Sequence, residues 1–153
     1  MLYASGLGTR LRLLTAALDD AVEQAYREAG IDFRARFYPY FRLMIAQESV
    51  SVGECVTRLG FTQPAATQTL QVMQREGLIE PVAGKDRRER RFALTAAARA
   101  MIPQLESIWT AITDAAHALD AALPHALSET VNAALRELER QSFAEMINKE
   151  LSR

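Results

Sequence analysis

The spacing of apolar residues divides the 153-residue chain into long helical stretches and one short segment of different pattern. Apolar positions recur at three- and four-residue spacing in three stretches, which predicts three long amphipathic helices. The stripes are Leu7, Leu11, Leu14, Leu18 and Val22; Met101, Leu105, Ile108, Ile112 and Leu119; and Val131, Leu135, Leu138 and Met146. The middle helix is expected over about 96–122 with a bend at Pro103, and Ser128 is expected to cap the last helix.

Residues 51–76 carry the signals of two shorter helices joined by a turn. Ser51 with Glu54 forms a capping-box pattern, so a helix is expected to begin at Val52. Gly60 supplies the positive φ of a sharp turn, and Thr62 is expected to cap a second helix that runs to about residue 76.

A hairpin is predicted directly after these two helices. Gly77 favours a left-handed end to the second helix. Residues 78–82 and 91–95 read as strands on either side of a turn at Gly84, with Pro81 suited to an edge strand. Two helices and a hairpin in this order are typical of a winged helix-turn-helix, in which one helix reads a DNA groove.

The second helix has two chemically different faces. One face is apolar and is expected to pack inward; it comprises Ala66, Leu70 and Met73. The other face is uncharged and polar; it comprises Gln63, Thr67, Gln68 and Gln71. Glutamine can bond an adenine edge at two points, which favours base reading, although a merely solvated polar face is the open alternative.

The tip of the predicted hairpin is basic. Lys85, Arg87, Arg88, Arg90 and Arg91 are opposed only by Asp86 and Glu89. Arginine suits phosphate oxygens and the negative potential of a narrow minor groove. A charge run alone often marks a solvated loop, but its position after a helix-turn-helix pattern favours a DNA-binding wing.

Four short motifs together resemble the MarR family of winged helix-turn-helix transcription regulators. They are residues 59–67 (LGFTQPAAT), 77–79 (GLI), 86–88 (DRR) and 94–95 (LT). The resemblance implies that Asp86 braces the wing and that Arg88 enters the minor groove. It also implies which side chains of the second helix face the major groove, namely Gln63, Pro64, Thr67, Gln68 and Gln71.

The expected fold class is mainly α with a small β-hairpin wing. We expect one domain over 1–153, with a DNA-binding lobe at 33–95 and dimerisation helices at 1–30 and 96–153. Any one apolar stripe is better explained by an intramolecular core. Three long stripes nevertheless exceed what so small a lobe can cover, which favours a two-fold homodimer. Such a dimer would hold two recognition helices about one DNA turn apart, as a pseudo-palindromic site requires.

The charge distribution is compatible with DNA despite a net charge of −1. Residues 51–100 carry eight basic and five acidic side chains, whereas residues 101–153 carry four basic and eight acidic ones. The positive charge is therefore concentrated in the lobe expected to bind DNA.

Few residues suggest other chemistry. Cys55 is the single cysteine and is expected to be a buried structural thiol rather than a redox sensor. His117 and His125 lack metal-ligand spacing, and the sequence contains no phosphate loop, nucleophile elbow or paired-carboxylate motif. We therefore expect no metal, no cofactor and no enzymatic activity. Without a signal peptide or membrane-spanning run, a cytoplasmic location is expected.

Aromatic residues suggest a small-molecule site. One helix, the second of the whole chain, is expected to carry Phe33, Phe37, Tyr40, Phe41 and Met44, and the long helix is expected to carry Trp109 and His117. The candidate effector pocket consists of Phe37, Tyr40, Phe41, Trp109 and His117. The alternative is an ordinary aromatic core. A small aromatic effector would act by favouring dimers whose recognition helices are wrongly spaced for DNA.

The function predicted from these features is a homodimeric transcription regulator, expected to repress from a pseudo-palindromic operator and to be released by a small aromatic effector. The alternative is a winged-helix protein-interaction module that does not read DNA. An adaptor of that kind would need neither the polar helix face nor the basic wing.

Overall fold

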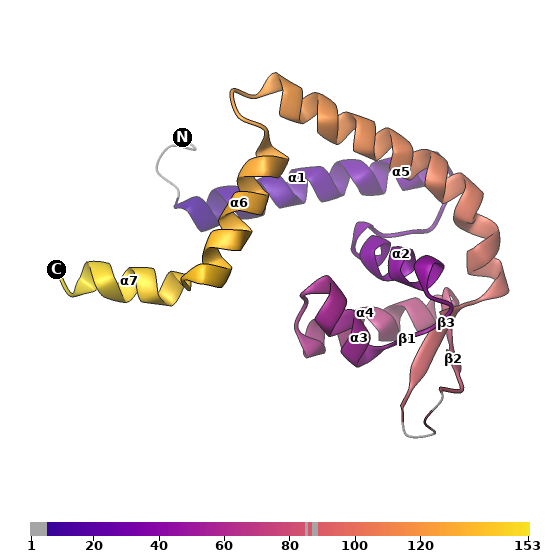
Figure 1. The fold of residues 1–153 in the computed structure, drawn as a ribbon. Coiled ribbons are helices and arrows are strands. Elements are labelled where there is room, and N and C mark those ends of the chain that lie inside the picture. Colours follow the sequence, from indigo (N-terminus) through magenta and orange to yellow (C-terminus); the bar gives the residue numbers. More distant parts are fainter. Residues whose placement is uncertain (1–5, 85, 87–88) are drawn as a thin grey trace. The chain divides into compact units, whose positions relative to one another are not determined.

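The computed structural model describes residues 6–84, 86 and 89–153 (Figure 1). The chain divides into two compact units, the first ending at Ile108 and the second beginning at Trp109. In chain order the elements are α1 (Leu7–Glu28), the 3-10 helix η2 (Ala35–Phe37), α2 (Tyr38–Ala46), β1 (Val50–Ser51), α3 (Val52–Leu59), α4 (Gln63–Arg75), β2 (Ile79–Val82), β3 (Arg91–Leu94), α5 (Ala96–Ala122), α6 (Leu127–Arg140) and α7 (Phe143–Leu151).

Local hydrogen bonds set the ends of α3. The Ser51 hydroxyl accepts a bond from the amide of Glu54 at 3.2 Å, and the Ser51 amide donates to the Glu54 carboxylate at 2.8 Å. These two bonds form the predicted capping box. Gly60 ends the helix with φ of 72°, a conformation that favours glycine.

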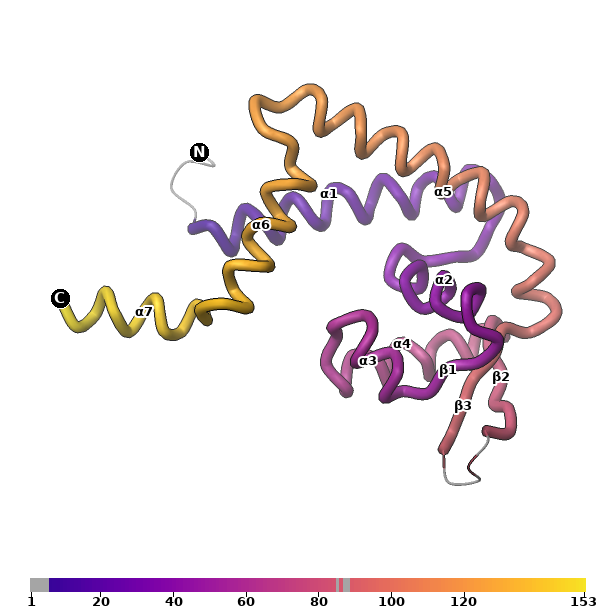
Figure 2. Tube along the Cα trace, in the orientation of Figure 1, coloured from indigo at the N-terminus to yellow at the C-terminus, as the bar shows by residue number. Residues whose placement is uncertain are grey.

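The recognition helix candidate, α4, also begins and ends as predicted. The Thr62 hydroxyl accepts from the amide of Ala65 at 3.4 Å, and Gly77 adopts φ of 73°. The amide of Leu78 then donates to the carbonyl of Met73 at 2.9 Å, which folds the chain back toward β2. Figure 2 shows α3 and α4 beside the hairpin that β2 and β3 form.

The sheet has three antiparallel strands in the order β1-β3-β2. The predicted hairpin is therefore present, and Pro81 lies on an edge strand, where its missing amide hydrogen costs no ladder bond. Strand β1 was not predicted; it pairs Val50 with Phe92 and so attaches the start of α3 to the root of the wing. Thr95 connects the hairpin to the helices, because its hydroxyl donates to the carbonyl of Gly77 at 2.7 Å and accepts from the amide of Ala98 at 3.1 Å.

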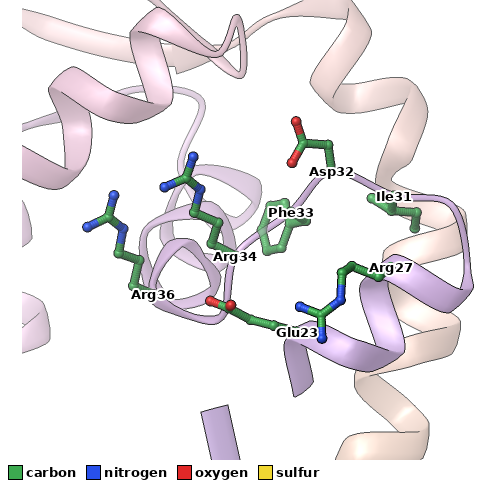
Figure 3. Close-up of a pocket in the computed structure, with 7 residues that line it drawn as sticks. All are labelled: Glu23, Arg27, Ile31, Asp32, Phe33, Arg34 and Arg36. Carbon is green, nitrogen blue, oxygen red and sulfur yellow. The ribbon is translucent and has the colours of Figure 1, made fainter. Parts of the chain in front are cut away.

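Aromatic side chains form much of the core of the first unit. Phe33 packs edge-on against Tyr26, Phe37 and Phe41, with ring centroids 5.1 to 5.7 Å apart. Phe37 and Phe41 have no exposed surface. Such edge-to-face pairs add to the stabilisation from burial. Beside this cluster, the segment from α1 to η2 borders a surface pocket of about 410 Å³ (Figure 3).

Two sequence predictions about helices were wrong. Phe33 and Phe37 do not lie on the same helix as Tyr40, Phe41 and Met44, since Phe33 precedes η2 and Phe37 ends it, whereas the other three belong to α2. The C-terminal stripe forms two helices, α6 and α7, rather than one; Ser142 caps α7 in a capping box with Glu145.

The predicted cap at Ser128 was wrong as well. Helix α6 begins at Leu127 after Ala126, which offers no side-chain cap. The Ser128 hydroxyl instead bonds the carboxylate of Asp120, which draws α5 and α6 together within the second unit. The two hydrogen bonds from Ser128 hold the pKa of Asp120 below its ordinary value.

The predicted fold class, mainly α with a small β wing, is confirmed. The single-domain organisation stays a prediction. None of the helices in the described part of the chain is both long and apolar enough to span a membrane.

Candidate nucleic-acid interface

Helix α4 packs by one face and presents the other to solvent. Its inward face contains Ala66, Leu70 and Met73, each at most 1% exposed. The predicted base-reading residues lie on the outward face: Gln63, Pro64, Gln68 and Gln71 are exposed and Thr67 is partly exposed. The structure thus brings together an uncharged surface rich in amide donors and acceptors, of the kind that can bond base edges.

The wing is described only in part. Lys85, Arg87 and Arg88, which were predicted to contact DNA, lie outside the described residues. Asp86 is exposed in a bend, and its carbonyl accepts from the amide of Glu89 at 3.1 Å.

Arg90 lies between the wing and α4. It is exposed, its guanidinium donates to the side-chain oxygen of Gln74 at 3.4 Å, and its Cζ lies 5.2 Å from the centroid of the Phe92 ring. These weak contacts leave Arg90 able to turn toward a phosphate. Gln74 was not singled out in the sequence because it falls between the two faces of α4.

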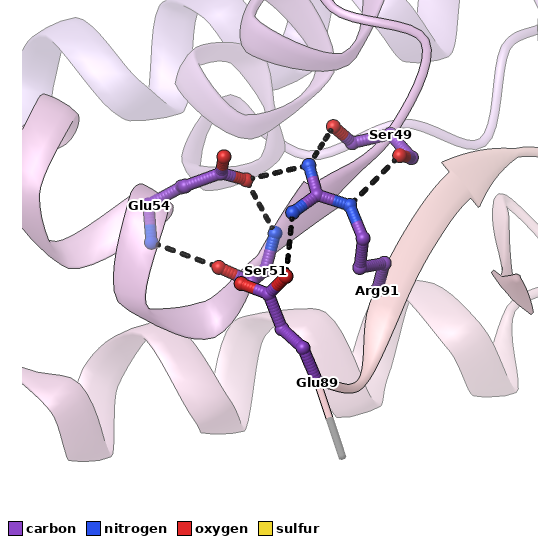
Figure 4. A network of polar contacts seen from close by, with 5 residues as sticks. All are labelled: Ser49, Ser51, Glu54, Glu89 and Arg91. Carbon is purple, nitrogen blue, oxygen red and sulfur yellow. Dashed lines mark hydrogen bonds and ion pairs between the residues drawn. The ribbon is translucent and has the colours of Figure 1, made fainter. Parts of the chain in front are cut away.

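Arg91 differs from its neighbours because its side chain is engaged inside the lobe (Figure 4). Its Nε donates to the Ser49 hydroxyl at 3.0 Å, and its Nη2 donates to the Ser49 carbonyl at 2.8 Å. Nη2 also pairs with the Glu54 carboxylate at 2.8 Å, and Nη1 pairs with Glu89 at 3.1 Å. The side chain is only 17% exposed. Arg91 therefore joins β3, the segment before β1 and the cap of α3.

Glu54 has two roles in this network. Its carboxylate accepts from the backbone of Ser51 and from Arg91. The first of these bonds, and then Arg91, hold the pKa of Glu54 below its ordinary value. The capping role could be predicted from residues 51 and 54 alone, whereas the link to Arg91 spans 37 residues and left no local signal.

The candidate effector residues fall in both units. Phe37, Tyr40 and Phe41 are buried in the first, and Tyr40 stacks on Phe61 with centroids 5.7 Å apart. Burial raises the pKa of Tyr40 above its ordinary value. Trp109 and His117 belong to the second unit. The effector pocket stays a prediction.

Cys55 is fully buried in α3, and desolvation raises the pKa of its thiol to about 11. Because thiolate is the reactive form, we expect the native protein to react with an aromatic disulfide reagent at pH 8 at least about 100-fold more slowly than the unfolded chain. The check is the rate of thiol release with and without denaturant. Equal rates would show that the thiol is accessible and ionised, and would support a redox role for Cys55.

No cluster of three or more metal-ligating side chains occurs among the residues that the structure describes.

The fold is similar to that of solved MarR-type regulators whose sequence identity to this chain is low. The sequence matches no family model and no curated protein. Among solved structures, the M. tuberculosis transcriptional regulator MOSR in complex with DNA is similar with a TM-score of 0.69 and 22% identity over 92% of this chain and 98% of that one. A mutant of E. coli MarR complexed with operator DNA is similar with a TM-score of 0.67 and 17% identity, over 86% of this chain and 92% of that one. Bordetella bronchiseptica BpsR, whose DNA binding is regulated by 6-hydroxynicotinic acid, is similar with a TM-score of 0.67 and 17% identity, over 90% of this chain and 95% of that one.

Proposed function

We propose that this chain is a sequence-specific, DNA-binding transcription regulator. The observation that carries the proposal is the outward face of α4, which is exposed, uncharged and rich in amides on a helix firmly packed by its other face. A helix held in this way can enter a major groove without reordering. The solved structures of MOSR and MarR with DNA support this proposal, since they share the fold.

Within this proposal the two parts of the lobe have different tasks. Gln68 and Gln71 bond base edges, with adenine as the favoured partner. The basic residues of the wing, with Arg88 foremost, bind the minor groove and the phosphate backbone. Arg91 takes another role than the sequence predicted: engaged with Ser49 and Glu54, it positions the wing against α3 instead of contacting phosphate.

The regulator acts as a homodimer through its terminal helices. Neither α6 nor α7 buries a residue within the described chain, and both expose large apolar side chains, as does α1 between Leu7 and Leu18. The exposed set is Leu7, Leu11, Leu13, Leu18, Val131, Leu135, Leu138, Phe143, Ile147 and Leu151. So much exposed apolar surface on one monomer is unusual, and a second copy of the chain would cover it.

The regulator represses transcription while bound to DNA and is released when a small effector binds it. The regulation of BpsR DNA binding by 6-hydroxynicotinic acid supports a ligand-controlled regulator of this fold. The ligand would have to bind the DNA-incompetent dimer more tightly than the competent one, because only differential affinity shifts such an equilibrium.

The test of the proposal is selection of bound fragments from a random duplex library, at low and at near-physiological salt. We expect an enriched inverted repeat with half-sites about one DNA turn apart. Binding that vanishes at the higher salt without any enriched motif would leave only backbone attraction. The protein-interaction module would then be the better description.

Replacing Arg88 with alanine tests the wing. We expect the loss of about 1–3 kcal/mol of binding free energy and a slope of log affinity against log salt that falls by about one. Fluorescence anisotropy over a salt series, with the selected duplex, measures both quantities. Arg136→Ala on α6 is the matched control, because it removes an exposed arginine outside the lobe. An Arg88 variant with the affinity and slope of the wild type would contradict the wing assignment.

A further inference from the structure

The surface pocket beside α1 is rich in arginine. It encloses about 410 Å³, within the size range of small-molecule sites. Arg27 and Glu23 reach it from the end of α1, and Asp32, Arg34 and Arg36 reach it from the segment that follows (Figure 3). Three guanidinium groups against two carboxylates leave the lining positive.

Two of the three arginines, Arg27 and Arg36, are not neutralised by any described carboxylate, whereas Arg34 is paired with Glu76. Within the described part of the chain, the Arg27 guanidinium forms no hydrogen bond or ion pair, and the Arg36 guanidinium contacts only the Phe37 ring, with its Cζ 5.5 Å from the centroid. No described ion pair joins Glu23 or Asp32 to any of the three arginines. Guanidinium donors therefore remain available to a ligand.

A buried ring holds two of these arginines in place. Phe37 is fully buried in the aromatic core, and the Cζ of Arg34 lies 5.7 Å from its centroid while Arg36 approaches the same ring. Two like charges held at one ring repel each other, and an anion between them would relieve that repulsion. Because the ring already restricts both side chains, binding would cost less conformational entropy.

We propose that this pocket binds a small organic or inorganic polyanion with carboxylate or phosphate groups. Planar guanidinium forks match the oxygen geometry of both groups and bind them through two parallel hydrogen bonds. Glu23 and Asp32 accept hydrogen bonds from hydroxyl groups of the ligand, so a hydroxylated polyanion suits the site better than a bare one.

Arg34 connects the pocket to α4. Its guanidinium forms an ion pair with Glu76, the C-cap residue of α4. The other carboxylate oxygen of Glu76 is buried and has no hydrogen-bond partner among the described residues. A negative charge at the C-terminal end of a helix is unfavourable, and Arg34 offsets it. An anion that draws Arg34 away leaves Glu76 uncompensated and loosens the last turn of α4.

The binding step is tested by calorimetry with citrate and with inorganic pyrophosphate, at ionic strength held constant with sodium chloride. We expect saturable binding of one anion per chain. Arg27→Gln and Arg36→Gln should each weaken it at least about ten-fold, the usual effect of losing a charge-assisted hydrogen bond. Arg136→Gln, on α6, should leave it unchanged. Absence of saturable binding by both probes, or equal binding by the pocket variants, would overturn the site.

The coupling step is tested by hydrogen exchange of the amides at residues 72–78, which needs no DNA. Saturating anion should speed exchange at the end of α4 in the wild type, and Arg34→Gln should speed it without anion and make it insensitive to anion. Binding without any change in exchange, or an unchanged response in the Arg34 variant, would overturn the coupling.

The consequence for DNA rests on the proposed function. Saturating anion should weaken binding of the wild type to the selected duplex at least about five-fold, a typical coupling between two sites, while the Arg34→Gln variant should show no such dependence. Failure to bind any duplex without anion would contradict the proposed function alone, whereas anion-independent DNA binding would contradict only this regulation.

Discussion

Replacing Leu135 with glutamate is expected to convert the proposed homodimer to monomers and to reduce affinity for the selected duplex at least about 100-fold. Leu135 is 57% exposed on α6 in the single chain, so the change should leave the monomer folded. In a two-fold interface the substitution counts twice. Each buried leucine contributes about 1.5–3 kcal/mol, which makes roughly 3–6 kcal/mol per dimer before the cost of burying carboxylates. Sedimentation velocity measures the dimer and anisotropy measures the operator.

The matched control is Ala133→Glu. This residue is also exposed on α6, but two positions from Leu135 it points about 200° away around the helix. We expect a dimer with the operator affinity of the wild type. If the Leu135 variant stayed dimeric at micromolar concentration, the two copies would have to associate through another surface.

The parts of the fold that could be predicted from sequence are those determined by neighbouring residues. The start of α3 depends on two bonds between Ser51 and Glu54, and its end depends on the positive φ of Gly60. Both signals lie within a few residues, so the pattern contains the whole cause. The same holds for the two faces of α4, because helical spacing alone separates them.

The elements that the sequence did not predict depend on residues distant in sequence, or on local signals that favour two different structures. Strand β1 has only two residues and exists because β3 lies beside it. Ser128 is a good cap by residue type, yet its hydroxyl bonds Asp120 instead. The start of α7 has a local signal, since Ser142 and Glu145 have capping-box spacing. The apolar stripe continues across this position, however, and so predicts one helix instead of two.

In the basic wing, too, the role of an individual residue depends on contacts that are distant in sequence. Arg90 and Arg91 are adjacent in a charge run, and nothing local distinguishes them. Their environments differ because Ser49, 42 residues earlier, meets Arg91 across the sheet, whereas Arg90 stays exposed. A charge run therefore predicts that a surface is basic, but its individual roles depend on tertiary contacts.

Replacing Arg91 with alanine is expected to destabilise the protein by about 2–3 kcal/mol, or roughly 5–10 °C in Tm. The change removes bonds to Ser49 and leaves the Glu54 carboxylate without its guanidinium. The two ion pairs contribute little to this loss, because Glu54 and Glu89 are partly exposed and solvent screens both pairs. Thermal unfolding measures the effect. Arg90→Ala is the control and should cost well under about 1 kcal/mol, since its contacts are exposed.

The stability difference between the wild type and the Arg91→Ala variant should become smaller in acid. The pKa of Glu54 is lowered in the folded protein, so the ion pair with Arg91 stabilises the fold above the ordinary pKa of 4.5 and is lost as pH falls through the lowered value. We expect the stability gap between the wild type and the Arg91→Ala variant to be constant near neutral pH and to narrow only in acid. If the difference in stability did not depend on pH, the destabilisation would come from the lost bonds to Ser49 alone.

Salt dependence separates the two roles considered for Arg91. If Arg91 contacts a phosphate, as the charge run predicts, its replacement lowers the slope of log affinity against log salt by about one. If it positions the wing through Ser49 and Glu54, the variant loses DNA affinity while the slope is unchanged, because no phosphate contact is removed. Arg91→Lys should recover only part of the loss, since an ammonium retains the charge but not the fork that binds both oxygens of Ser49. A lowered slope in the alanine variant, with full recovery by lysine, would restore Arg91 to the DNA interface.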